Sequence, residues 1–298
     1  MENWIYFVFA SEFIWAVTSL IDKIVLSKNY IRNPVVYIVL NGAMNIFLIF
    51  LLPFVGFSSL SLINSFIAIS AGAMLSAGIV YYYKAVQHEE ISRVLVLWQL
   101  VPIFVLLLSF LFLRESLTAK DFTGFLFLIS AGILISYKKE VSFRMSKAFW
   151  YMMVSAFFIS IYYIASKYIY GITNFWNAFF WTRLGGLTGL CVLLVPSIKK
   201  QFFGTLKIMK SKVKCLLLFK MSIDFSAFIL LGYAMLNGPI PLISALGSSS
   251  APIFIFILTI FTSLYAPKLI KEKIDNKSIL IKLFAIALVV IGIIFVNM

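Results

Sequence analysis

The chain has 298 residues, of which 62% are hydrophobic and only 12% are charged. Soluble proteins contain roughly 45 to 50% apolar and about 25% charged residues, and a soluble core must be wrapped in a polar surface. The composition therefore excludes a soluble globule and a disordered chain. The formal charge of +14 would fit nucleic-acid binding in a soluble protein. The placement of the charges along the chain must decide between nucleic-acid binding and a membrane protein with basic loops. Two cysteines are too few for a disulfide scaffold or a thiolate metal cluster.

Ten apolar runs follow one another along the chain, each close to the roughly 20 residues that a membrane-spanning helix needs. The first run opens on Glu2 rather than on a basic stretch and lacks a small-residue cleavage site, so we expect a span and not a signal peptide. The runs are continuously apolar, which excludes the alternating strands of a β-barrel. We predict an all-α polytopic membrane protein with spans at 4–26, 33–55, 63–86, 91–113, 119–137, 147–170, 175–196, 213–236, 239–265 and 277–297.

The loops between these runs are short and leave no room for a soluble catalytic domain. The longest, 197–212, interleaves lysines with apolar residues at roughly helical spacing. An amphipathic segment lying on anionic lipid explains this pattern better than nucleic-acid binding does.

The two halves of the chain, 1–139 and 140–298, carry matching residues at nearly constant offsets. An odd number of five spans per half means that the second half enters the membrane from the opposite side, which is the inverted-repeat plan of many secondary transporters. The matches are Tyr83 with Tyr233 and Pro102 with Pro252 at 150 residues, Lys23 with Lys167 at 144, and Gly42 with Gly185 and Pro53 with Pro196 at 143.

Several short motifs of the first half recur more loosely in the second. The first half has Tyr83-Lys84-Ala85, Pro102-Ile103-Phe104, the run from Phe112 to Thr118, Gly124 and Ala131-Gly132-Ile133, and the second half has Gly232-Tyr233-Ala234, Ala251-Pro252, Lys271-Glu272 and Ile291-Gly292. These motifs resemble the EamA repeat of the drug/metabolite transporter superfamily. The resemblance implies a central cavity formed by helices one to four of each half, with the fifth helices as a supporting pair. It also implies transport of metabolites, often outward.

Lysines and arginines outside the spans or at their ends are distributed unequally between the two faces. The odd-numbered loops carry eighteen, whereas the even-numbered side has three, Arg114, Lys120 and Lys167. The positive-inside rule then predicts cytoplasmic odd-numbered loops and both termini outside, in the cell membrane.

Charged residues inside predicted spans need a partner, a wet cavity or a function. Glu12 shares a helix face with Trp15 and Ser19, and lies at about the same depth as Arg183, roughly 12 Å from the start of its span. Two roles are possible for these residues. Glu12 and Arg183 could form an ion pair with each other, or each could contact a substrate. Lys220 and Asp224 lie four residues apart on one helix, so they can pair with each other or serve the function.

The fourth helix of each half contains a proline that frees a backbone carbonyl on the preceding turn. Before Pro102 stand Trp98 and Gln99, and the matching positions before Pro252 are Ser248 and Ser249. Close packing of small residues would explain the serines, but the symmetric placement favours the lining of a cavity. The helix related to the first span adds Tyr162 to this candidate site.

These features predict a secondary transporter, most simply an exporter, of a small polar metabolite such as an amino acid, working by alternating access at a midplane cavity. Coupling to protons or exchange would supply the energy, because no Gly-rich phosphate loop is present. We predict no enzyme activity, cofactor, metal site or nucleic-acid partner, with a small-molecule substrate and the bilayer as partners. Efflux of hydrophobic cations, a membrane-embedded enzyme and a non-transporting assembly partner stay open as alternatives.

Overall fold

A computed structural model describes residues 3–27, 35–51, 58–89, 91–136, 146–265 and 276–297. All regular elements in these ranges are helices, which confirms the predicted fold class. The first half contains α1 (Asn3–Ser27), α2 (Val35–Met44), η1 (Asn45–Leu51), α3 (Leu62–His88), α4 (Ile91–Leu97), α5 (Leu100–Leu108), η2 (Ser109–Leu113) and α6 (Ala119–Ser136). The second half contains α7 (Lys147–Ile172), α8 (Phe175–Gly186), η3 (Leu187–Leu194), α9 (Pro196–Ile208), α10 (Ser211–Asn237), α11 (Ile240–Tyr265) and α12 (Asn276–Asn297).

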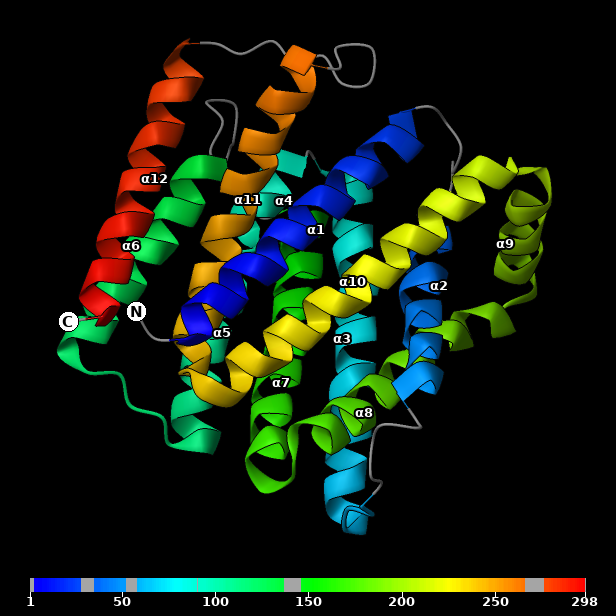
Figure 1. Ribbon diagram of the computed structural model, residues 1–298, viewed down its shortest axis with the longest axis horizontal. Coiled ribbons are helices and arrows are strands. Elements are labelled where there is room, and N and C mark those ends of the chain that lie inside the picture. Colours follow the sequence, from blue (N-terminus) through cyan, green and yellow to red (C-terminus); the bar gives the residue numbers. More distant parts are fainter. Residues whose placement is uncertain are drawn as a thin grey trace.

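Nine helical segments of the described residues are long and apolar enough to cross a membrane. The remaining predicted span, 33–55, corresponds to α2 and η1. Their 10 and 7 residues run on without a break but end at Leu51, where the described range stops. The count of ten therefore stays a prediction. Figure 1 shows the start of α1 near the end of α12.

The second helix of each half changes type along its length. α2 passes into the 3-10 helix η1 after Met44, and α8 passes into the 3-10 helix η3 after Gly186. These changes lie near the glycines that the sequence comparison matched, Gly42 and Gly185. The two halves thus share a local feature, although the inverted repeat itself stays a prediction.

Glycines bring helices of the two halves into backbone contact along α3, α8, α2 and η3. A Cβ atom at Gly185 would overlap the carbonyl oxygen of Ile69, and one at Gly72 would overlap that of Thr182. A Cβ at Gly42 would lie 2.9 Å from the carbonyl carbon of Gly189. We call these four glycines, Gly42, Gly72, Gly185 and Gly189, the glycine seam.

The fifth helices, α6 and α12, pack against each other at one edge of the molecule (Figure 1). A Cβ at Gly124 would lie 2.8 Å from the carbonyl oxygen of Gly292, so these helices also approach at a glycine. The expected supporting pair is present.

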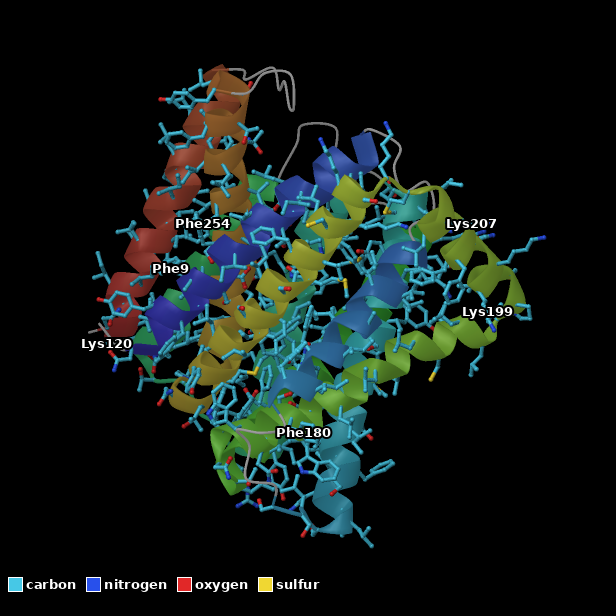
Figure 2. The ribbon with its side chains drawn as sticks, turned by 45° about the vertical axis from the view of Figure 1, so that its right-hand side comes forward. Phe9, Lys120, Phe180, Lys199, Lys207 and Phe254 are labelled. Atoms are coloured by element: carbon cyan, nitrogen blue, oxygen red, sulfur yellow. The ribbon has the colours of Figure 1, made fainter. Side chains whose placement is uncertain are left out.

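The basic segment that was predicted to lie on lipid forms the short helix α9, which begins at Pro196. Pro is well suited to the first turn of a helix because no hydrogen bond to its nitrogen is needed there. Phe202 is buried against the bundle, whereas Lys199 and Lys207 extend outward from α9 (Figure 2). The helix is therefore amphipathic, with its lysines exposed.

Candidate functional site

A cavity of about 320 Å³ lies between the two halves of the chain. Its walls come from α1, α3 and the α4–α5 region of the first half, and from α7, α10 and α11 of the second. This volume is at the lower end of the roughly 300 to 1,000 Å³ found for small-molecule sites. Of the predicted site residues, six line the cavity: Glu12, Trp15, Trp98, Tyr162, Ser248 and Pro252. Their role in binding a substrate stays a prediction.

Glu12 is the single acid among the described residues that line the cavity, and no lysine or arginine is among them. Its side chain lies against α11 at Gly247, where a Cβ atom would stand 2.7 Å from Glu12 Oε1. Gly247 thus leaves the space that the carboxyl group occupies. The residue is 7% exposed, so its charge is held away from bulk water.

Aromatic rings form much of the remaining wall. Seven of the twenty lining residues are aromatic: Trp15, Tyr82, Tyr83, Trp98, Tyr162, Tyr163 and Phe228. Tyr82, Tyr83, Tyr163 and Phe228 were not among the site residues predicted from the sequence. Phe228 follows Asp224 by four residues on the same helix face, which could have indicated it, whereas no pattern singles out Tyr163.

Gln99 and Ser248 contact each other and join the two halves directly, whereas their symmetric positions predicted that both line the cavity. Gln99 Nε2 donates to the carbonyl oxygen of Ser248 at 3.1 Å, and Ser248 Oγ donates to Gln99 Oε1 at 3.0 Å. The carbonyl of Ser248 is the one that Pro252 leaves without its helical N–H partner, because proline at i+4 has no hydrogen to donate. The amide of Gln99, 2% exposed, therefore satisfies a carbonyl that would otherwise be unpaired inside the membrane.

The two prolines have different effects on their helices. α11 continues through Pro252, whereas the predicted single helix 91–113 is broken between α4 and α5 at Trp98 and Gln99. Around this break the backbone makes tighter bonds over three residues, from Gln99 N to Val96 O and from Val101 N to Trp98 O. The break frees Gln99 to turn its side chain toward α11, so Gln99 and Pro102 support the cavity wall without lining it.

Arg183 does not pair with Glu12. No described acid lies within ion-pair distance of its guanidinium, which instead stacks on two rings, with Cζ 4.1 Å from the ring centre of Phe228 and 5.1 Å from that of Tyr162. The residue is 1% exposed and its Nη2 has no hydrogen-bond partner. It lines a separate void of about 30 Å³ that shares Phe228 with the central cavity. Arg183 thus stands one aromatic layer behind the cavity wall.

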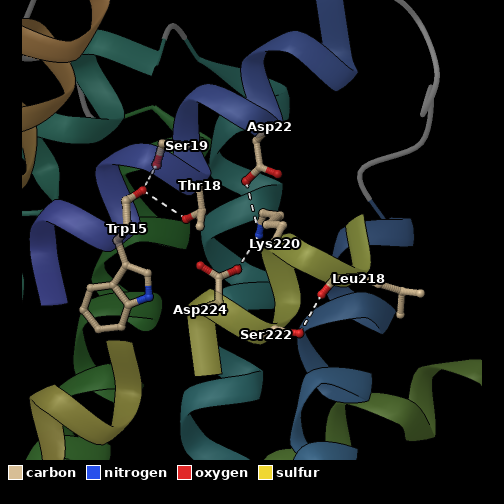
Figure 3. A network of polar contacts seen from close by, with 8 residues as sticks. All are labelled: Trp15, Thr18, Ser19, Asp22, Leu218, Lys220, Ser222 and Asp224. Atoms are coloured by element: carbon tan, nitrogen blue, oxygen red, sulfur yellow. Dashed lines mark hydrogen bonds and ion pairs between the residues drawn. The ribbon is translucent and has the colours of Figure 1, made fainter. Parts of the chain in front are cut away.

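Lys220 and Asp224 form the predicted ion pair, with Lys220 Nζ donating to Asp224 Oδ2 at 2.6 Å. A second carboxylate, Asp22 of α1, lies 3.5 Å from the same Nζ, which the sequence interpretation missed (Figure 3). We call Asp22, Lys220 and Asp224 the buried triad. None of its members lines the cavity.

The hydroxyl groups of two other predicted site residues bond within their own helices. Ser19 Oγ donates to the carbonyl oxygen of Trp15 (Figure 3), and Ser249 Oγ donates to that of Leu246. Neither residue lines the cavity. The helical face of Glu12 and Trp15 therefore reaches the cavity, while Ser19 one turn further on does not.

Beyond one end of the cavity, Glu115 and Lys167 hold the turn between α10 and α11. Lys167 Nζ donates to the carbonyl oxygens of Met235 and Gly238 at 2.7 and 2.8 Å, and lies 3.9 Å from Glu115 Oε1. Glu115 Oε2 accepts from the backbone nitrogen of Ile240 at 3.0 Å, at the start of α11. The ammonium group of Lys167, counted above among the basic residues of the even-numbered side, is therefore used inside the protein.

Comparison with known proteins agrees with this architecture. Residues 2–137 match the model of the EamA-like transporter family. No curated protein sequence gives a match. One solved crystal structure of another protein aligns with 99% of this chain and 96% of its own chain, with a TM-score of 0.65. The sequence identity is 17%, so the similarity shows a shared fold. Residues 2–137 are therefore similar to the EamA-like transporter family, and the chain that contains them is a multi-pass membrane protein.

Proposed function

We propose that the protein is a secondary transporter of small molecules that carry an ammonium group, and that the central cavity is their binding site. The observation that carries this proposal is the single acid, Glu12, in the wall of an otherwise uncharged cavity. A buried carboxylate without an ion-pair partner favours a positively charged ligand, which would complete the pair. The EamA-like sequence supports transport as the activity.

The aromatic walls favour the same class of substrate. Rings of Trp and Tyr attract cations through their faces and also cover apolar groups. Trp15 lies on α1 and Trp98 at the break between α4 and α5 in the first half, and Tyr162 and Tyr163 lie on α7 of the second. A molecule with an ammonium group and a compact apolar body therefore fits these walls.

Amino acids and simple amines differ in their need for Arg183. A carboxylate would gain from a guanidinium, but Phe228 and Tyr162 stand between Arg183 and the cavity. An amino acid requires the ring of Phe228 to move, whereas an amine does not. The observed arrangement favours amines and hydrophobic cations, with amino acids as the second candidate class.

Movement of the substrate would follow alternating access between inverted repeats 1–139 and 140–298, driven by a gradient, most simply outward. The excess of basic residues in the odd-numbered loops supports cytoplasmic odd-numbered loops and external termini. A protease site fused after Met298 should then resist a cytoplasmic protease in intact cells. Cleavage there would reverse the assignment.

Thermal unfolding of the purified protein with matched ligand trios tests the substrate class. Each trio contains an amino acid, the amine that lacks its carboxylate and the acid that lacks its ammonium, all with the same side chain. We expect amines to raise the melting temperature, since a ligand that binds the folded state stabilises it by about 2.7 kcal/mol at 100 times its Kd. Glu12→Gln should abolish this rise, whereas the control Glu115→Gln, outside the cavity, should retain it.

The same trios separate the two candidate classes. If amino acids are the substrates, they should stabilise the protein more than the amines do, and Arg183→Met should remove that difference. Stabilisation by the acids alone, or by amines equally in Glu12→Gln, would contradict the proposal.

A further inference from the structure

The buried triad is a charged cluster that the cavity does not use. Lys220 is 8% and Asp224 6% exposed, and both lie in α10, while Asp22, whose side chain is 27% exposed, lies on α1, which packs along α10. Both helices are among the segments apolar enough to cross a membrane. A charged group at such a position is expensive to bury and marks ion or proton pathways in transporters.

The charges of the triad do not cancel. One ammonium group faces two carboxylates, so the fully ionised cluster carries one net negative charge. Lys220 Nζ contacts Oδ2 of both aspartates, whereas Oδ1 of Asp22 and Oδ1 of Asp224 are buried without a hydrogen-bond partner. Each carboxylate therefore keeps one oxygen free. An unpaired buried charge and two unsatisfied oxygens cost several kcal/mol unless something neutralises them.

We propose that the buried triad binds one proton and is the coupling site of the transporter, separate from the substrate cavity. A proton from water adds to Oδ1 of one aspartate, the carboxylate becomes a carboxylic acid, and the cluster passes from one net negative charge to none. The Lys220 ammonium keeps the other aspartate as its partner. The coupling role rests on the transport function proposed above, but proton binding by the cluster does not.

Among the side chains that the structure describes, few other groups around the triad could compensate the charge. On α3, Tyr82 lies near Asp22 and also lines the cavity, but its hydroxyl group is neutral at ordinary pH. On α8, Arg183 stacks over Phe228, one turn beyond Asp224, without an ion pair to either aspartate. Along α11 the sequence has no acid or base apart from Tyr265 at its end, and Glu12 on α1 stands ten residues before Asp22.

Tyr82 and α1 also join the triad to the cavity. Asp22 and Glu12 lie on the same helix, about 15 Å apart along its axis at 1.5 Å per residue. A change of charge at Asp22 therefore acts on the helix that carries the cavity carboxylate. Proton binding at Asp22 can therefore affect the substrate site through α1, although the proton and the substrate do not contact each other.

Infrared difference spectra of the purified protein in lipid nanodiscs test proton binding directly. The probe is the proton, varied from mildly acidic to mildly alkaline pH, and all samples carry Glu12→Gln so that the cavity carboxyl does not contribute. We expect a carboxylic C=O stretching band that disappears as the pH rises. Asp22→Asn and Asp224→Asn should each abolish it, because each leaves one lysine with one carboxylate.

Either variant alone suffices if the other fails to fold, and Asp121→Asn, at the start of α6, is the matched control that should retain the band. A band that is missing from the parent, or unchanged in a folded Asp22→Asn or Asp224→Asn protein, would overturn the proposal.

The coupling role is tested in proteoliposomes with the labelled amine that stabilises the protein most. An imposed pH gradient should make the wild-type protein accumulate this amine, whereas Asp22→Asn should only exchange it across the membrane. Accumulation by Asp22→Asn equal to wild type would overturn the coupling role. A protein that shows the infrared band but transports no amine would instead contradict the proposed function.

Discussion

Arg183 and Lys220 are two bases buried in membrane-spanning helices, and the protein accommodates them in opposite ways. Lys220 lies between two carboxylates, at 2.6 Å from Asp224 and 3.5 Å from Asp22. Arg183 has no acid within ion-pair distance and rests on the rings of Phe228 and Tyr162. A delocalised, weakly hydrated guanidinium tolerates an aromatic environment better than a compact ammonium does.

The difference lies in what each base leaves behind when it is removed. Without Lys220, two carboxylates lose their counter-ion, whereas without Arg183 only two rings lose a contact. Stability measurements on the two sites should therefore differ in size, even though both residues are buried cations.

The largest effect is expected for Lys220→Met. The substitution leaves Asp22 and Asp224 buried without a positive partner, and breaking a buried pair costs about 3 to 5 kcal/mol. The free energy of unfolding in detergent should fall by that amount, or the protein should fail to fold. Lys214→Met on the same helix, at an exposed position, is the control and should change little. A loss below about 1 kcal/mol for Lys220→Met would remove the distinction between the two bases.

A smaller effect is expected for Arg183→Met. The methionine side chain retains apolar contact with Phe228, and the substitution breaks no ion pair. The lost cation–π contacts are worth about 2 kcal/mol at a desolvated site, and relief from burying an unpaired charge offsets part of this. We expect a decrease in unfolding free energy below about 2 kcal/mol, measured in the same detergent. A decrease as large as that of Lys220→Met would indicate an acidic partner for Arg183.

The same two residues show how far the sequence could be interpreted. The pair of Lys220 with Asp224 was predictable because four residues make one helical turn. The contact with Asp22 and the stacking of Arg183 were not, because both depend on how α1, α7, α8 and α10 pack. Equal depth made Glu12 and Arg183 plausible partners, but depth does not fix the direction in which a side chain points.

Span positions were predicted to within a few residues because continuous apolar runs reflect the thickness of the bilayer. The matched prolines also pointed to Trp98 and Ser248, which line the cavity, but the contact between Gln99 and Ser248 was not predicted. The break of the fourth helix at Trp98 and Gln99 was not predicted. Pro102 and Pro252 occupy matching positions in the sequence, yet the helix that contains Pro252 is unbroken. The same residue type thus accompanies two outcomes: the carbonyl that Pro252 frees accepts from the side chain of Gln99, whereas the one before Pro102 accepts from the backbone nitrogen of Val101.

The glycine seam has a consequence for how the volume between the halves can change. Along Gly72 and Gly185 the two backbones already touch, so α3 and α8 have no compressible layer of side chains between them. Around Glu12 the halves are separated by large rings that can change rotamer. The helices cannot approach each other more closely at the glycine seam. Expansion or contraction of the cavity must therefore come from rotation about the seam or from movement of the rings, and the seam would act as a fulcrum of nearly fixed width.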